Sequence, residues 1–520
     1  MQPRGLRVAI AAGALLALVA LILPASSAAA AEAEGSAAKT LADSGFRPGP
    51  NGYSFANYGN EDGYSNLAPV DMERMFGSAV CARGTGTDCV LTAIAAEGME
   101  SINQMMGIGH CMGFAVTAQS FFEGYDSPAS FGSALVPDLQ IDGNVALQRK
   151  IAEGWTYQLF PSVQAGEVKG KPAKILRTLR TALRGGDESY VLTIFMADGS
   201  GGHAITPFAI SKWRPGLFKV RVYDNNWPER TRSVTVNTRR NTWRYQASIN
   251  PSVGSDLYAG NRKTKTLNLL PIKPGLGEQP CFFCDESFSK GRGGSVEPGP
   301  LTVFWEGDVV DGRHGDLLIR NGAGRRAGCD GEGCFNEIPG ADMWELLQEV
   351  RVWRHSAPPI FRLPAGERYS LSLTGSGLTG TGAAEEGLKV VGAGFSLGVS
   401  GVRLTAGETD RIELARNGRE LVFVNDRHGV ESPDITLTTG AGEAHYRFEV
   451  RARGVDPGSE IGFEIKPGAE QLLIDTADAA GAGSFAVRIT RIDADGNDAL
   501  ATELTLRPGE PAAIDYGSLS

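Results

Sequence analysis

The sequence predicts an α+β domain in the first half of the chain and all-β, sandwich-type modules in the second half. In the first half, apolar residues recur at helical spacing, most clearly over 111–122 and 172–184. Short apolar runs typical of buried strands follow over 190–223. From Leu301 onward apolar and polar residues alternate, and the turn pattern Leu-x-x-Gly-Glu occurs three times.

Length and composition limit the possible functions. A chain of 520 residues has room for about three domains, and 42% hydrophobic residues are enough to form cores. The formal net charge is −10 and there is no block of basic residues. This argues against nucleic acids and anionic membranes as partners. We expect neither a cofactor nor a bound metal.

The first residues have the pattern of a secretory signal peptide. Arg4 and Arg7 precede an apolar run from Val8 to Leu23, and small residues fill 25–31. We expect residues 1–31 to be removed near Ala31, because sixteen apolar residues are short for a membrane span. An uncleaved anchor is the alternative. The mature protein is expected outside the cell or at its surface, with no membrane contact after cleavage.

Seven cysteines support the same location. Outside the cytoplasm, six that lie close in sequence should form disulfides and leave one thiol free. The 281/284 pair and the 329/334 pair could instead cross-link to each other or share a zinc ion. The six are Cys81, Cys89, Cys281, Cys284, Cys329 and Cys334, and the remaining one is Cys111.

Cys111 is the candidate nucleophile. Two glycines precede it, and apolar or small residues then recur at helical spacing to Phe122, so Cys111 should lie in the first turn of a buried helix. That position has partial positive charge and free N–H groups, which favour a thiolate and can bind an oxyanion. A structural buried cysteine is the alternative.

A base and an orienting group follow in sequence. His203 opens a predicted strand after a glycine-rich turn, whereas His110 is adjacent to Cys111 and diverges from it on the helix. Asp224 and Asn225 come directly after another predicted strand. An imidazole can take and return the thiol proton, and a polar group can fix its tautomer. Either Asp224 or Asn225 could have that second role.

Two amides at the end of the preceding helix are candidate oxyanion donors. Asn103 and Gln104 follow the apolar stripe of a predicted helix over 92–106. An inward-facing amide needs a partner, so one of the two could point an N–H at the oxyanion. Ordinary polar residues at a helix end are the alternative.

The order of these elements resembles the papain-like cysteine peptidase fold. A Gly-x-Cys helix start, a Gly-His-Ala strand start and a strand ending in Asp/Asn occur in the family's order over about 90–230. The helix before the histidine strand is also similar to that of the bacteriocin-processing peptidases. The resemblance implies that Cys111 is the nucleophile and His203 its base, with Asp224 or Asn225 orienting the imidazole.

The predicted organisation is a signal peptide over 1–31, a papain-like domain over 32–275, a Gly/Pro-rich linker over 276–300, a β-rich module over 301–400 and a β-sandwich module over 401–520. Residues 341–352 are expected to form a helix within the β-rich half. The favoured function is a thiol-dependent peptidase acting on a peptide or protein. A transglutaminase-like acyltransferase and a catalytically inactive surface-binding protein are the alternatives, and the β-rich half could contact a cell surface or polysaccharide.

Overall fold

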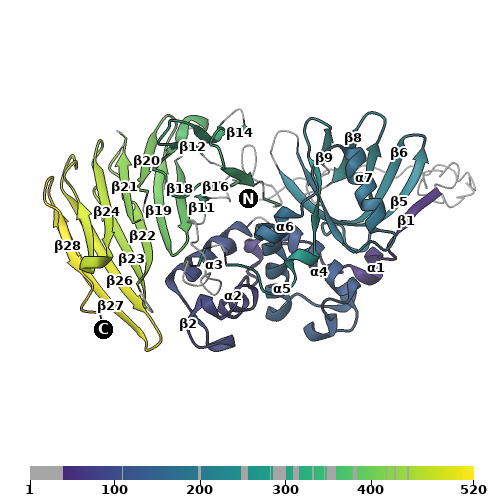
Figure 1. Ribbon diagram of the computed structural model, residues 1–520, viewed down its shortest axis with the longest axis horizontal. Coiled ribbons are helices and arrows are strands. Elements are labelled where there is room, and N and C mark those ends of the chain that lie inside the picture. The colour runs from purple at the N-terminus through teal and green to yellow at the C-terminus, as the bar shows by residue number, and fades with distance from the viewer. Residues whose placement is uncertain are drawn as a thin grey trace, which may run out of the picture. The chain divides into compact units, whose positions relative to one another are not determined.

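The computed structural model describes residues 39–519, except 108, 197–200, 248–255, 282, 285–299, 308–314, 331–332, 345, 348–358, 379–382, 417–418, 427–428 and 442–443. The predicted signal peptide lies outside the described residues, as does the larger part of the predicted linker. In the described part, the first half contains helices and one large sheet, and the second half contains two large sheets (Figure 1). This confirms a helix-containing region followed by a β-rich one.

The α-helices of the described residues all lie in the first half. They are α1 (Pro48–Asn51), α2 (Pro69–Phe76), α3 (Ala93–Met105), α4 (Cys111–Glu123), α5 (Val145–Thr156), α6 (Pro161–Ala165) and α7 (Pro172–Ala182). Helix α4 is buried on every side from Cys111 to Phe121, as expected for a helix that is apolar or small all round. It packs tightly on α5, because a Cβ on Gly113 would lie 2.0 Å from the carbonyl oxygen of Ile151.

An antiparallel sheet completes the first half. Its order is β10-β4-β5-β6-β7-β8-β9, and β1 pairs with the free part of β5. The strands are β1 (Lys39–Asp43), β4 (Tyr190–Phe195), β5 (Gly202–Arg214), β6 (Leu217–Tyr223), β7 (Thr231–Asn237), β8 (Thr242–Ala247), β9 (Asp256–Asn261) and β10 (Leu267–Pro271). The strands expected over 190–223 are thus confirmed, and β5 is buried from Gly202 to Ser211. A small hairpin, β2 (Cys81–Arg83) with β3 (Val90–Leu91), lies apart from this sheet.

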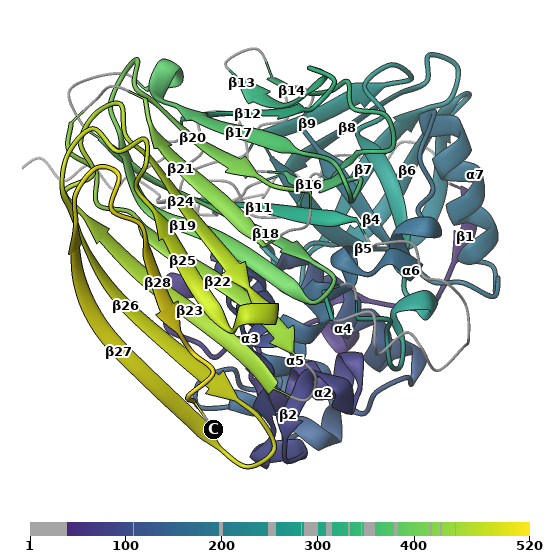
Figure 2. The ribbon, with the colours of Figure 1, turned by 60° about the vertical axis from the view of Figure 1, so that its left-hand side comes forward.

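The second half consists of two nine-stranded antiparallel sheets that face each other across one hydrophobic core (Figure 2). The first has the order β15-β16-β11-β18-β19-β22-β23-β26-β27, with β11 (Leu301–Gly307), β15 (Asp342–Trp344), β16 (Ile360–Leu363), β18 (Ala384–Gly392), β19 (Phe395–Leu404), β22 (Asp434–Ala441), β23 (Ala444–Arg453), β26 (Gly483–Ile492) and β27 (Asn497–Leu506). The second has the order β14-β13-β12-β17-β20-β21-β24-β25-β28, with β12 (Asp316–Asn321), β13 (Arg326–Asp330), β14 (Gly333–Asn336), β17 (Tyr369–Thr374), β20 (Thr409–Leu414), β21 (Glu420–Asn425), β24 (Glu460–Lys466), β25 (Gln471–Asp475) and β28 (Ala512–Asp515).

Two expectations for this half need correction. The boundary expected at residue 400 lies within β19, and both sheets take strands from either side of it, so the described part of 301–520 is one two-sheet unit. The helix expected over 341–352 is wrong at its start, because Asp342–Trp344 forms strand β15. Pairing of β15 with β16 outweighs the helical spacing of its apolar residues.

The two halves share buried contacts. Phe304, Ile360 and Val391 of the β half belong to the same hydrophobic cluster as Ile94 and Ile102 of α3. Figure 2 shows α3 beside the sheet that contains β22 and β23. The catalytic candidates therefore lie in a unit whose core includes side chains from both halves.

A charge cluster joins the halves at the same place. Glu97 of α3 is 1% exposed and binds Lys389 of β18 at 3.0 Å and Arg447 of β23 at 2.9 Å. Lys389 also lies 3.5 Å from Glu306 of β11. Because buried charges are tolerated only when they are paired, these contacts fix how α3 lies on the β half.

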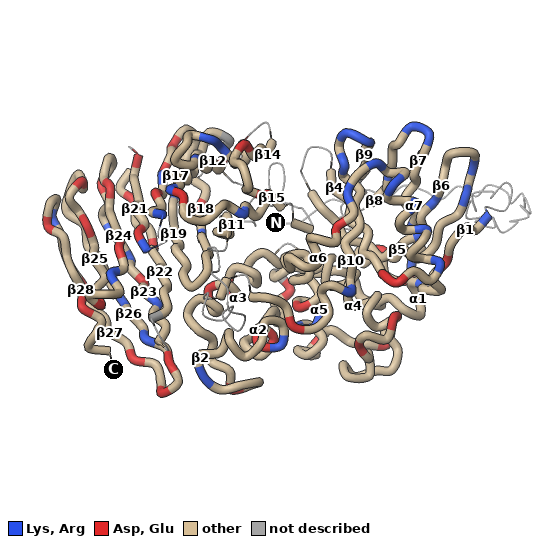
Figure 3. The backbone as a smooth tube through the Cα atoms, in the orientation of Figure 1, with Lys and Arg blue, Asp and Glu red and all other residues tan. Residues whose placement is uncertain are grey.

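One edge of the first-half sheet is strongly basic. The turns β5–β6 and β7–β8 and the loop that follows β9 start at the same edge, because successive antiparallel strands from β5 to β9 alternate in direction. They contain no Asp or Glu, and Figure 3 shows Lys and Arg gathered there. The exposed basic residues of these turns are Lys212, Arg214, Arg239, Arg240, Arg262, Lys263 and Lys265.

The cysteine prediction is confirmed. Disulfides join Cys81 to Cys89, Cys281 to Cys284, and Cys329 to Cys334, and the free cysteine is Cys111. The cross-link and the zinc site considered for the last two pairs are therefore not formed. Three disulfides suggest an extracellular protein. Among the described residues, the helices are too short or too polar to span a bilayer.

Candidate functional site

Cys111 is the first residue of α4. Cys111 is 0% exposed. Its sulfur lies 3.7 Å from the carbonyl oxygen of Leu347, a residue of the β half. The first turn of a helix has N–H groups without an intrahelical acceptor, so the thiol lies in a field that favours negative charge. The sequence placed Cys111 correctly at this helix start.

His203 and Asp224 are brought together by strand register. Thr206 of β5 pairs with Tyr223 of β6, so the start of β5 lies beside the end of β6. Nε2 of His203 lies 2.9 Å from Oδ1 of Asp224, and both residues are buried. Asp224 also accepts a hydrogen bond from the hydroxyl of Tyr245 in β8 and one from the backbone N–H of Asn226 at 2.9 Å. The carboxylate is held by three partners.

The protonation of this pair follows from its surroundings. Burial lowers the pKa of His203, but the charge and hydrogen bond of Asp224 and the contact with Cys111 outweigh it, so the pKa lies well above the ordinary value. Burial raises the pKa of Asp224, but the charge of His203 outweighs it and the pKa is lowered. Nδ1 of His203 is buried, and no atom of the described residues lies in hydrogen-bonding position to it. It is the ring nitrogen left to exchange a proton with Cys111.

No family model, no curated protein and no solved structure matches the chain.

Asn225 has a different role from Asp224. Its Nδ2 donates to the carbonyl oxygen of Cys111 at 3.1 Å and to that of Ala204 at 2.9 Å. The amide thus ties the start of α4 to the start of β5, and positions Cys111 relative to His203. Of the two candidates for orienting the imidazole, the contact with the ring is made by Asp224.

The two proposed oxyanion donors are not brought to Cys111. Asn103 uses its amide on the backbone of Leu67, donating to its oxygen and accepting from its N–H, each at 3.0 Å. Gln104 is exposed and lines a surface pocket with Glu306 and Glu386. Both residues lie in the last turn of α3, before Gly107, and their side chains are not directed at the thiol. We correct that expectation: the remaining donors at the site are the first N–H groups of α4.

His110 is structural. Its ring nitrogens lie 2.9 Å from the carbonyl oxygen of Tyr58 and 2.8 Å from Oδ1 of Asn66. Burial lowers its pKa to about 4, so the imidazole stays neutral. It fixes the loop before α2 onto the start of α4 and does not compete with His203 as a base.

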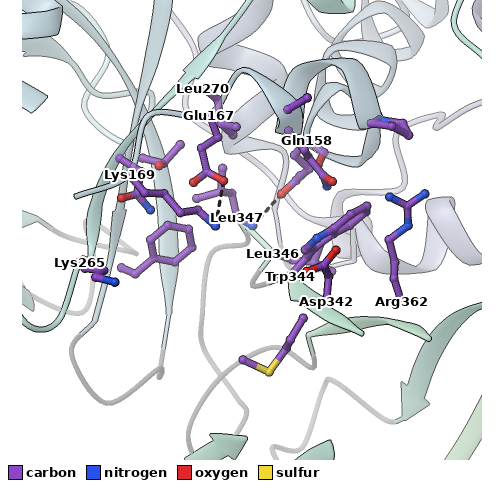
Figure 4. Close-up of a pocket in the computed structure, with 17 residues that line it drawn as sticks. Gln158, Glu167, Lys169, Lys265, Leu270, Asp342, Trp344, Leu346, Leu347 and Arg362 are labelled. Carbon is purple, nitrogen blue, oxygen red and sulfur yellow. Dashed lines mark hydrogen bonds and ion pairs between the residues drawn. The ribbon is translucent and has the colours of Figure 1, made fainter. Parts of the chain in front are cut away.

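Two parts of the site were missed by sequence reasoning. Tyr245 supports Asp224. Gln158 is anchored by its own Nε2, which donates to the carbonyl oxygen of Trp155 in α5 at 3.2 Å. Gln158 also accepts the backbone N–H of Leu347 at 2.8 Å (Figure 4). Neither residue lies in a motif, and each reaches the site through tertiary packing, so no local pattern could have shown its role.

The described residues offer one group of three candidate metal ligands, Glu73, Cys81 and Cys89. Because Cys81 and Cys89 form a disulfide, their sulfurs are not available as thiolate ligands. A cavity of about 540 Å³ lies beside Leu346 and Leu347 of the covering segment, lined by residues of both halves, including Phe195, Leu270 and Trp344.

Proposed function

We propose that the chain is an exported thiol-dependent hydrolase, a cysteine peptidase that cleaves peptide or protein substrates through an acyl-thioester on Cys111. The observation that carries the proposal is the buried contact between His203 and Asp224 beside a free thiol at a helix start. A helix N-terminus, a base and an oriented carboxylate are the parts that thiol activation requires.

In the proposed reaction, Nδ1 of His203 takes the proton of Cys111 and the thiolate attacks the amide carbonyl carbon. The oxyanion lies near the first N–H groups of α4. The C–N bond breaks as the imidazolium returns its proton to the leaving amine. Water, deprotonated by His203, then hydrolyses the thioester and restores the thiol. Asp224 holds the ring and stabilises the imidazolium throughout, and Tyr245 holds Asp224.

One observation favours the alternative of an inactive binding protein. Cys111 is completely covered, and its thiol contacts Leu347 rather than solvent. A buried thiol in this state cannot meet a substrate unless the covering segment moves. The test must therefore separate a covered nucleophile from a cysteine that is only part of the core.

The experiment compares the mature chain with its Cys111→Ala, Cys111→Ser and His203→Ala variants, using casein hydrolysis and mass-mapped alkylation by iodoacetamide. Cys111→Ala should abolish hydrolysis with the fold retained, and His203→Ala should lose nearly as much, because members of such a unit fail together. His203→Ala should also slow alkylation of Cys111 at neutral pH, because the base that takes the thiol proton is lost. Full activity of Cys111→Ala would overturn the proposal. So would a thiol that stays unreactive after Leu347→Ser opens the site.

A further inference from the structure

The segment that covers Cys111 comes from the β half. Strand β15 lies at the edge of its sheet and pairs with β16. After Trp344 the chain leaves the sheet, and Leu346 and Leu347 enter the hydrophobic cluster that the two halves share, where they are 6% and 1% exposed. Two leucines beyond the end of β15 are thus buried in a cluster made mostly of first-half side chains.

The backbone of this segment is held at the catalytic residues. The carbonyl oxygen of Leu347 lies 3.7 Å from Sγ of Cys111, and its N–H donates to Oε1 of Gln158 at 2.8 Å. The carbonyl oxygen of Leu346 lies against Gly202, the residue before His203. A Cβ at Gly202 would be 2.9 Å from that oxygen, so only glycine leaves room for the segment.

Polar and apolar contacts here match those of a bound peptide. A buried amide accepts a backbone N–H, one backbone carbonyl lies at the nucleophile, and the leucine side chains fill apolar space. The adjoining cavity is lined by Phe195 and Leu270 together with polar residues, among them Gln158, which contacts Leu347 directly (Figure 4). Backbone contacts of this kind recognise any extended chain, and the apolar space selects its side chains.

We infer that the groove between Gln158, Gly202 and Cys111 is a binding site for extended peptides with two adjacent leucines, and that Leu346 and Leu347 occupy it in cis. This inference rests on the proposed function and names the side chains that its substrates carry. It assigns Gln158 as a positioning residue, since that residue holds the peptide backbone and does not take part in the chemistry. A substrate competes with the chain's own leucines, which explains why the thiol is covered.

The test uses the full mature chain with Leu346→Ser and Leu347→Ser combined. The matched control is Leu472→Ser, which removes an equally buried leucine of β25 far along the chain. Alkylation of Cys111 by iodoacetamide is timed with increasing acetyl-Leu-Leu-aldehyde or acetyl-Ser-Ser-aldehyde. An aldehyde protects by adding the sulfur to its carbonyl carbon while the thiol proton moves to the oxygen.

The double variant should be alkylated at least about tenfold faster than the unchanged chain, with no such rise for Leu472→Ser. The leucine aldehyde should protect Cys111 from alkylation at a concentration at least about tenfold lower than the serine aldehyde. In the Gln158→Leu variant, the concentration of leucine aldehyde needed for the same protection should rise about tenfold. Equal protection by both aldehydes, or equal acceleration by Leu472→Ser, overturns the inference and leaves the proposed function standing. A folded double variant with an unreactive thiol contradicts the proposed function itself.

Gly202→Ala provides a second route if the double variant does not fold. The added methyl meets the Phe195 ring at 2.8 Å and the Leu346 oxygen at 2.9 Å, and so displaces the segment without removing either leucine. Alkylation of Cys111 should again accelerate by at least about tenfold. An unchanged rate in a folded Gly202→Ala chain would show that Leu346 does not restrict access, and would overturn the inference.

Discussion

Asn225 offers the sharpest test of how the site is assembled. Its side chain is completely buried, and its Nδ2 serves two buried carbonyl oxygens, those of Cys111 and Ala204. Asn225→Ala removes both donors at once. Leaving a buried acceptor unsatisfied costs about 1–3 kcal/mol, so the two together should lower the free energy of unfolding by about 2–6 kcal/mol. Asn225→Asp should cost at least as much, because a carboxylate offers the two oxygens no donor.

The assay is urea unfolding of the full chain, followed by intrinsic fluorescence, together with the alkylation rate of Cys111. Asn237→Ala is the matched control, since the exposed turn of Asn237 caps only the N–H groups of Arg239 and Arg240. We expect the control to cost less than about 1 kcal/mol and to leave the thiol rate unchanged. If Asn225→Ala lost no more than the control and kept the same thiol rate, Asn225 would not be what joins α4 to β5.

Three further predictions concern charge and redox state. Asp224→Asn removes the charge that raises the pKa of His203. In the unchanged chain, protonated His203 stabilises the fold at acidic pH, and this contribution is lost as the pH rises through the pKa of His203 in the folded chain. The variant should therefore lose more stability at acidic pH than at alkaline pH. Urea unfolding between about pH 5 and 9 checks this, and a loss that grows with pH would contradict it. Lys389→Met should lower the free energy of unfolding by about 3 kcal/mol, because Glu97 stays buried. Adding Glu97→Gln should recover part of that loss. If the losses of the two single variants simply summed in the double variant, the coupling between Lys389 and Glu97 would be refuted. Unfolded without reductant, the chain should take up one equivalent of iodoacetamide at Cys111, and three or more equivalents would mean that a disulfide is missing.

The parts of the site that the sequence predicted are those set by local chemistry. Cys111 follows two glycines at the start of a helix, and His203 and Asp224 flank predicted strands. Antiparallel pairing of β5 and β6 then brings the last two together without any further information. The disulfides are similarly local, since each joins cysteines that are close in sequence.

The remaining parts depend on contacts between distant segments. Leu347 contacts Cys111 from 236 positions away in the sequence. Tyr245 contacts Asp224 because β8 and β6 belong to the same sheet. The expected helix over 341–352 shows why such a contact is hidden. Its apolar spacing fits helix burial, but Leu346 and Leu347 are buried against another part of the chain rather than along one helix face. Periodicity reports that a side chain is buried, not what buries it.

The basic edge of the first-half sheet has a consequence for how the molecule meets charged surfaces. Seven exposed Lys and Arg residues, in and beside turns that contain no Asp or Glu, produce a positive field that reaches about 8 Å at physiological salt, although the chain as a whole carries −10. On an anionic matrix the protein should therefore adsorb in one preferred orientation, with this edge down and retention falling steeply with salt. The β6–β7 turn, which begins with Asp224, lies at the opposite edge of the same strands. An immobilised molecule would in this way keep the β6–β7 turn, and with it Asp224, facing away from its support.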